Sequence, residues 1–320
     1  MRRFLLIRGL QSLVVLTIMS FVIYSLIGLM PGDPIDLMIS ANPNMTAADA
    51  AALRELYGLD LPVYERYWNW LTTALSGDLG YSRLFGQPVL DVLIPALKNS
   101  VVLMGTAFVL AVCIAIPVGT FAASKPRSAL DYGVNLFAFA GISIPSFWLA
   151  LMLIIVFGVF LGWLPAGGIA ADGAGLLEQA KYMVLPVATI ATLSIGSYSR
   201  YTRSSMLEVL RQDYIRTARA KGASRSRVVW KHALRNAMIP VVTILALDFG
   251  YLFSGALVTE TIYSWPGMGK LIFDSVMGND FNLALVALLF ATALTLTGNL
   301  LADICYAFLD PRIVIGGEKT

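Results

Sequence analysis

Few residues of this chain have the types and spacing that catalysis or metal binding requires. The single histidine, His232, has no second histidine or cysteine at a metal-binding spacing, and its basic surroundings do not suit a serine–histidine–acid triad. The two cysteines, Cys113 and Cys305, each lie in an apolar stretch, where we expect buried thiols instead of a disulfide or a metal site. The sequence therefore predicts no catalytic residue and no metal ligand.

A phosphate-binding loop is also missing. Such a loop reads Gly, four residues, Gly-Lys and then Ser or Thr, because its backbone N–H groups must surround the phosphates. Gly269-Lys270 is followed by Leu271, and Lys221-Gly222 has the reverse order. We therefore expect that the chain binds no ATP and no cofactor of its own.

The basic residues are concentrated in one stretch, since ten of the twenty-three lysines and arginines lie between Arg200 and Arg235. Within it, Ser205-Met-Leu-Glu208 has the form of a capping box at a helix start. Asp213 can cap a second, short helix, Gly222 suits the left-handed position after that helix, and Ser224 can begin a third. The stretch is thus predicted to be a helix–turn–helix unit.

Two functions suit this unit. It can anchor the chain on anionic lipid, or it can present a helix to a soluble partner. A lipid anchor needs no face of small residues, and the stretch supplies such a face with Thr217, Ala218, Ala220, Gly222 and Ala223. The small residues favour docking to a partner.

The composition indicates a membrane protein, because 58% of the residues are apolar and only 13% are charged. A helix needs about 20 apolar residues to cross a bilayer. Six windows of the sequence satisfy this requirement: 8–30, 99–123, 134–161, 181–200, 236–259 and 284–308. We predict an all-α, polytopic membrane protein with six transmembrane helices.

The positions of lysine and arginine predict the orientation, because these residues are enriched in cytosolic loops. With the N-terminus in the cytosol, seventeen of them fall on the cytosolic side and six outside. The first span is expected to be a retained anchor, because its apolar run is too long for a signal peptide and Leu29 to Pro34 lacks a cleavage pattern. Both termini are therefore predicted to be cytosolic.

These spans divide the chain into residues 1–30 with the first span, an external helical segment 31–98, a five-helix core 99–308 that includes the loop 201–235, and a cytosolic tail 309–320. In the external segment, one helix is expected from Thr46 to Gly58, Gly77 to Gly80 should form a turn, and another helix should begin near Pro62. The second helix has an apolar face that suits either the membrane interface or a docking platform.

Prolines and acids inside the spans suggest further features. Kinks are expected at Pro117, Pro145 and Pro186, and Pro240 should open the fifth span. Asp248 lies near the middle of the fifth span, where a carboxylate is costly, so it should either face a translocation path or be a hydrogen-bonded structural group. The outer loop from Thr259 to Lys270 should fold back compactly.

At this point the chain resembles a known family. The run from Asp213 to Ser224, continued by His232 to Val241, is similar to the coupling-loop signature of ATP-binding-cassette importer permeases of the dipeptide, oligopeptide and nickel type. Arg216-Thr-Ala218 stands where the general signature has Glu-Ala-Ala, and Gly222 keeps its register. The other matching segments are Met30–Pro34, Tyr57–Asp60, Gly77–Gly80, Ile144–Trp148, Ser204–Glu208 and Thr259–Gly267.

The resemblance implies the type I importer permease fold in a bacterial inner membrane. It also implies four kinds of partner: a homologous second permease, two cytosolic ATPase subunits that carry ATP and Mg²⁺, an external substrate-binding protein, and the surrounding lipid, with no nucleic acid. The coupling residues it implies are Glu208, Asp213, Tyr214, Arg216, Thr217, Ala218, Arg219, Lys221 and Gly222, and Asp248 is the candidate for the path. Peptides are favoured over glutathione, nickel or sugars. The alternative is a channel or ion-coupled carrier that acts without ATPase partners.

Overall fold

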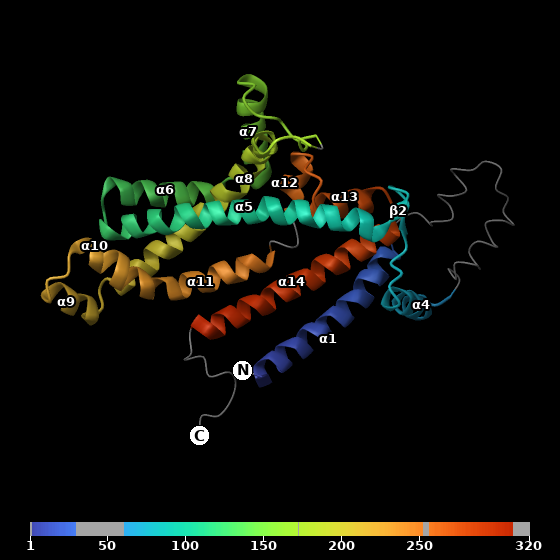
Figure 1. Ribbon diagram of the computed structural model, residues 1–320, viewed down its shortest axis with the longest axis horizontal. Coiled ribbons are helices and arrows are strands. Elements are labelled where there is room, and N and C mark those ends of the chain that lie inside the picture. Colours follow the sequence, from blue (N-terminus) through green and yellow to red (C-terminus); the bar gives the residue numbers. More distant parts are fainter. Residues whose placement is uncertain (1, 30–60, 172, 252–255, 310–320) are drawn as a thin grey trace.

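The computed structural model describes residues 2–29, 61–171, 173–251 and 256–309. In these ranges the chain is a bundle of long helices with one short hairpin (Figure 1). Five of the described helices are long and apolar enough to cross a membrane, or six if one bent pair forms a single span. The predicted class, an all-α polytopic membrane protein, is confirmed.

The long helices follow the predicted spans with shifted ends. They are α1 (Arg2–Ile27), α5 (Val89–Ser124), α6 (Ala129–Ser143), α8 (Leu176–Val209), α11 (Leu234–Tyr251) and α14 (Phe281–Leu309). The shorter elements are α4 (Val63–Leu75), β1 (Tyr81–Ser82), β2 (Gln87–Pro88), α7 (Ser146–Leu153), η1 (Ile154–Phe160), α9 (Asp213–Ala220), α10 (Arg225–Arg227), η2 (Val228–Ala233), α12 (Leu257–Ile262) and α13 (Met268–Met277). Helix α5 begins at Val89, well before the predicted start at residue 99.

The third span is broken. A continuous helix over 134–161 was predicted with a kink at Pro145, but α6 ends at Ser143 and α7 begins at Ser146, with an angle of 102° between the two segments. Proline disfavours helical geometry in the residue before it, and Ile144 is extended, with φ −82° and ψ 122°. As a result, α7 points away from the bundle (Figure 1).

The fourth span extends further than predicted. Helix α8 runs without interruption to Val209, so the capping box predicted at Ser205 and Glu208 is wrong. The Ser205 hydroxyl instead donates to the carbonyl of Ala237 on α11, at 2.7 Å. The fifth span also differs, because Pro240 lies inside α11 and does not open it, and α11 ends at Tyr251, short of residue 259.

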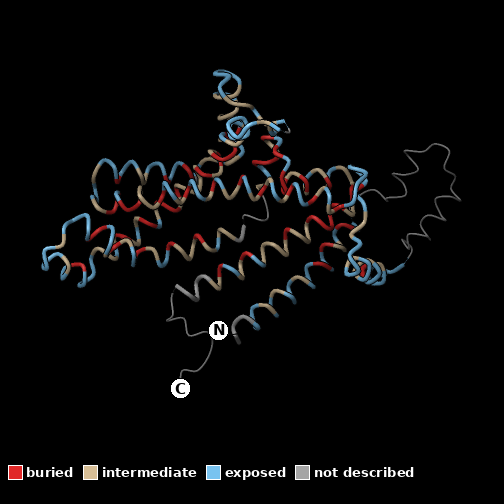
Figure 2. The backbone as a smooth tube through the Cα atoms, in the orientation of Figure 1, coloured by how far each residue is buried: buried red, intermediate tan, exposed pale blue. Residues whose placement is uncertain are grey.

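The core of the bundle lies where α5 packs against α8 (Figure 2). Small residues let the two backbones approach closely: a Cβ atom on Gly119 would lie 2.5 Å from the carbonyl oxygen of Ser199 and 2.8 Å from Cβ of Thr202. The alanines of α5 at 107, 111 and 115 are fully buried in the same contact. Much of the outward surface of the spanning helices is exposed and apolar, as expected for a membrane protein.

Helix α6 also packs against α8. The main-chain atoms of Ala138 on α6 lie close to Gly196, where a Cβ atom would be 3.2 Å from Cα of Ala138. At one end of the pair, the guanidinium of Arg203 makes a bidentate contact with the buried carboxylate of Asp131. Asp131 also accepts from the backbone N–H of Arg127 at 2.9 Å. Helix α8 is therefore fastened to both α5 and α6.

At the opposite end of the molecule, the chain forms a compact cap. The predicted turn at Gly77–Gly80 is confirmed: both glycines have positive φ, and the Asp78 carboxylate accepts from the N–H of Gly80 at 2.8 Å. In α4, Tyr67 is buried and its hydroxyl shares a hydrogen bond with Ser20 of α1, at 2.6 Å. Pro62 is the N-cap of α4, and the helix predicted from Thr46 to Gly58 lies outside the described residues.

Two buried acids fasten this cap to the long helices. Glu260, which has no exposed surface, accepts from the hydroxyl of Ser100 on α5 and from the N–H of Lys270. Asp280 accepts from the hydroxyl of Ser82 in the hairpin and from the N–H of Leu84. The segment from 257 to 277, which forms α12 and α13, thus folds back against α5, as predicted for a compact loop.

The close packing of α5 against α8 can be tested with two glycine substitutions on α5, one at the contact and one away from it. Gly119→Ala should destabilise the protein by about 1–3 kcal/mol, because the added methyl group meets backbone atoms that cannot move aside. Gly105→Ala, on the same helix, adds a methyl group that meets nothing within 4 Å and should stabilise the helix by up to about 1 kcal/mol. Thermal unfolding of the purified protein in detergent measures both, and equal shifts would contradict the close packing.

Candidate coupling site

Helices α9 and α10 protrude at the end of the molecule opposite α4 and the hairpin (Figure 1). Residues 210–212 connect α8 to α9, and residues 221–224 connect α9 to α10. The helix α10 continues through η2 into α11, so that Arg225 to Phe249 forms a single candidate span. The predicted helix–turn–helix is present, but its first helix is the end of α8.

The N-terminus of α9 differs from the prediction. Its N-cap is Gln212, which makes no side-chain capping bond, and Asp213 is the first helical residue. The Asp213 carboxylate pairs with Arg216 one turn later, and the Thr217 hydroxyl donates to the Asp213 carbonyl at 3.1 Å. Asp213 therefore acts within the first turn, where an acid suits the positive end of the helix dipole.

The C-terminus of α9 is as predicted. Gly222 has φ +80°, and its N–H donates to the carbonyl of Arg219 at 2.9 Å. The N–H of Ala223 donates to the carbonyl of Ala218 at 3.1 Å. This pair of bonds is a Schellman motif, which needs a left-handed residue at Gly222. The predicted cap at Ser224 is also present, since its side chain accepts from the N–H of Arg227.

The inner face of α9 packs against the rest of the protein. Ile215 is fully buried beside Met206 of α8 and Val228 of η2. Ala218 and Ala223 are half-buried against the same cluster. Ala218 therefore packs inward, whereas it was predicted to belong to the small face that approaches a partner.

The other predicted coupling residues are exposed. A Cβ atom on Gly222 would meet nothing within 4 Å, and Lys221 beside it is exposed. The remaining exposed members of the set are Glu208 in the last turn of α8 and, on α9, Asp213, Tyr214, Arg216, Thr217 and Arg219. Eight of the nine predicted residues are therefore exposed on α9 or beside it, although Tyr214 also contacts α11 and Arg219 lines a recess beneath α9.

Two contacts that the sequence did not predict hold this unit in place. The side-chain amide of Asn236 on α11 donates to the Tyr214 hydroxyl at 2.9 Å. The guanidinium of Arg225 donates to the carbonyl of Ser124, at the end of α5, at 2.6 Å. Each joins residues of different elements, so no local pattern in the sequence signals it.

Asp248, the candidate for the translocation path, lies near the end of α11 and not on α9. Its carboxyl is a hydrogen-bond partner of the Tyr198 hydroxyl on α8, and Ser194 contacts the same tyrosine. Tyr198 is buried and packs edge-on against Phe108 of α5, with ring centroids 6.3 Å apart. Asp248 is thus a half-buried acid facing other helices of the bundle.

The cysteines and the possible metal ligands are the remaining candidates from the sequence. The Cys113 thiol is exposed on α5, which contradicts the predicted burial, and the side chain of Cys305 lies outside the described set. In the part of the chain that the structure describes, no three His, Cys, Asp or Glu side chains come together as metal ligands.

The bundle of long apolar helices matches models of one protein family. Residues 115–315 match the family model "Binding-protein-dependent transport system inner membrane component", and residues 1–97 match the model of its N-terminal part. The chain belongs to this family. It is a multi-pass inner-membrane component of a binding-protein-dependent transport system, which replaces the alternative of a carrier or channel acting alone.

Several characterised relatives are similar over nearly the whole chain. The oligopeptide transport system permease protein AppB of Bacillus subtilis is 41% identical, with 98% of this chain and 99% of the relative covered. The dipeptide transport system permease protein DppB of Escherichia coli K12 is 35% identical, with 91% and 92% covered. The glutathione transport system permease protein GsiC of Escherichia coli O6:H1 is 37% identical, with 93% and 94% covered.

A solved structure supports the fold. A chain of the MetNI methionine ABC transporter in an inward-facing conformation aligns with a TM-score of 0.56 and 16% identity, over 70% of this chain and 98% of that chain. At that identity the likeness concerns the fold alone.

Proposed function

We propose that the chain imports di- or oligopeptides by alternating access, with ATP and Mg²⁺ bound by separate ATPase subunits that dock on α9. The observation that carries the proposal is the geometry of α9: a short helix with its inner face anchored by Ile215 and its outer face free. A helix fixed in this way can pass a displacement of its partner to α8 and α11. The relatives named for oligopeptides and dipeptides support the substrate class.

The proposed complex contains a second, homologous permease subunit, two cytosolic ATPases and an external substrate-binding protein. In this arrangement α9 faces the cytosol, together with both termini, and the cap formed by α4 and the hairpin faces outward. The excess of basic residues around α9 supports this orientation, since seventeen of twenty-three lysines and arginines fall on that side.

The outer face of α9 gives the sharpest test. Thr217→Trp and Gly222→Asp should each reduce substrate-stimulated ATP hydrolysis by the reconstituted complex at least about tenfold, equal to about 1.4 kcal/mol of coupling. The reason is steric, because both positions are exposed and a larger group would hold the ATPase away. Ala218→Trp is unsuitable, since Ala218 packs inward and its replacement would disturb the loop itself.

The control for this test is Ser226→Trp, which adds the same side chain at an exposed position on α10. It should leave hydrolysis unchanged, and all variants should insert in the membrane. A lipid anchor would respond differently: Arg216→Gln with Lys221→Gln would impair it, and Gly222→Asp would not. Normal hydrolysis with both Thr217→Trp and Gly222→Asp would exclude the coupling role.

Orientation is tested by labelling single cysteines on a background in which Cys113 and Cys305 are replaced by alanine. Ser76 and Ser226 are both exposed, whereas Ser82 is buried by its bond to Asp280 and cannot be used. A membrane-impermeant maleimide applied to intact cells should label Ser76→Cys and should reach Ser226→Cys only after the membrane is opened. The reverse pattern would place α9 outside and exclude docking to cytosolic ATPases.

Asp248 is proposed to face the translocation path. A carboxylate within a span is costly unless it is paired or hydrated, and its described partner is a single hydroxyl. Asp248→Asn should lower peptide uptake at least about threefold while the complex still assembles. Tyr198→Phe removes only the hydrogen bond to Asp248, so it separates a role in the path from a structural role. If Tyr198→Phe and Asp248→Asn both reduce only thermal stability and leave uptake per assembled complex unchanged, Asp248 is a structural group.

A further inference from the structure

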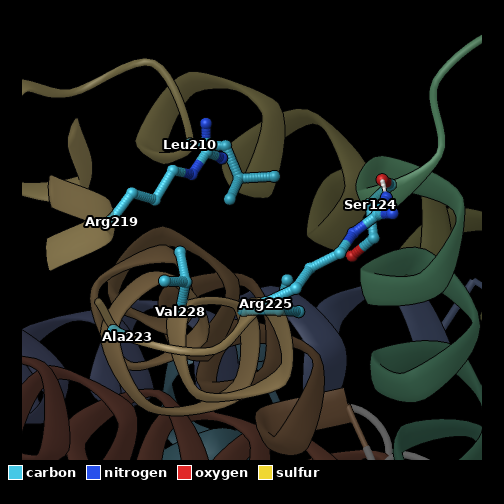
Figure 3. Close-up of a pocket in the computed structure, with 7 residues that line it drawn as sticks. Ser124, Leu210, Arg219, Ala223, Arg225 and Val228 are labelled. Carbon is cyan, nitrogen blue, oxygen red and sulfur yellow. Dashed lines mark hydrogen bonds between the residues drawn. The ribbon is translucent and has the colours of Figure 1, made fainter.

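Two adjoining recesses lie beneath α9, where the ends of α5 and α8 meet α10 (Figure 3). Their volumes are about 400 Å³ and about 550 Å³. Both are lined by Ser124, Leu210 and Arg219. In Figure 3, Arg219 extends from α9 toward Leu210, and Arg225 reaches toward Ser124. We refer to the two recesses together as the arginine recess.

The arginine recess is strongly basic. Its five arginines are Arg127, Arg203, Arg211, Arg219 and Arg225. Among the described residues, only Arg203 has an acidic partner, the buried Asp131, and Arg225 bonds a main-chain carbonyl. The side chains of the other three make no ion pair and no hydrogen bond with the described residues. Like charges gathered in this way repel one another, and a bound anion would remove the repulsion.

The rest of the lining is apolar and small. Leu210, Ala223, Val228 and Val229 form one wall, and Ala123 and Leu207 contribute to the other recess. A free inorganic anion would gain nothing from such walls. A phosphate group that carries an apolar body would satisfy both parts of the lining, because arginine binds phosphate oxygens in a bidentate fashion and the apolar body would cover the half-buried Leu207, Leu210 and Ala223.

The position of the recess favours one source of this chemistry. Ser124 is the last residue of α5, and the apolar window predicted for this span, residues 99–123, ends directly before it. If that window fills the hydrocarbon core, the recess lies beside the lipid headgroups. Basic pockets between transmembrane helices at this depth suit anionic headgroups. We propose that the arginine recess binds the phosphate headgroup of an anionic phospholipid from the leaflet on that side.

Binding there would affect the coupling helix. Arg219 belongs to α9, Arg225 to α10 and Ser124 to α5, so a headgroup between them would hold α9 against the spanning bundle. Anionic lipid would thus increase the coupling of ATP hydrolysis to transport. This consequence rests on the proposed coupling role of α9, whereas lipid binding by the recess does not.

The test uses the complete importer in nanodiscs of phosphatidylcholine, alone or with added phosphatidylglycerol. Phosphatidylglycerol retained by the complex is counted by native mass spectrometry, and ATP hydrolysis is measured in parallel. The test variant is Arg127→Gln with Arg225→Gln. The control, Arg227→Gln with Lys231→Gln, removes the same charge from exposed residues that do not line the recess.

The wild type and the control should retain phosphatidylglycerol equally, and the test variant should require about tenfold more of it for the same retention. Equal loss in both double variants would mean a general basic surface and would overturn the proposal. Stimulation by inorganic phosphate in pure phosphatidylcholine would also overturn it, since the source would then be a free anion.

Assembly and coupling are separated within the same experiment. If the double variant does not assemble, Arg211→Gln, whose exposed side chain makes no described contact, provides the retention measurement. Lipid retention with unchanged hydrolysis would contradict only the effect on coupling. If Thr217→Trp has no effect and the retention difference remains, the proposed function fails while the lipid site stands.

Discussion

The contact between α5 and α8 at Gly119 is the constraint on which the functional end of this protein depends. Without a side chain at Gly119, the main chain of α5 can lie against Ser199 and Thr202. Helix α8 is thereby held along its length and reaches Val209 unbroken. Met206, in its last turns, then provides the buried surface on which Ile215 of α9 rests. The position of α9 is therefore set by packing that begins deep in the bundle.

The sequence predicted the features that depend on local chemistry. The spans follow from apolar length, and the end of α9 follows from Gly222 and Ser224, whose caps involve only residues a few positions away. The false capping box at Ser205 shows the limit of this reasoning. The same pattern occurs within a continuous helix, and the hydroxyl found its acceptor on α11, at Ala237.

Proline effects depended on tertiary surroundings in a way that local sequence does not reveal. Pro117, Pro186 and Pro240 all lie inside helices, whereas Pro145 separates α6 from α7. At Pro145 the departing helix finds new partners: the Tyr263 hydroxyl donates to the carbonyl of Ala150 at 3.2 Å. The buried acids Glu260 and Asp280 were missed for a similar reason, because their serine partners lie more than 150 residues away along the chain.

Which face of α9 is free was also decided by tertiary contact. The run of small residues was correct as a sign of close approach, but Ala218 uses its small size to approach the cluster around Ile215 instead of a partner. The helix thus has an inner face held by apolar contact and by the bond from Asn236 to Tyr214, and an outer face with no covering element. Because the inner face is fixed to α8, η2 and α11 together, a force on the outer face must move these elements as one unit. A flexible loop of the same composition would absorb that force, so the proposed coupling role depends on the anchoring of α9 more than on its charge.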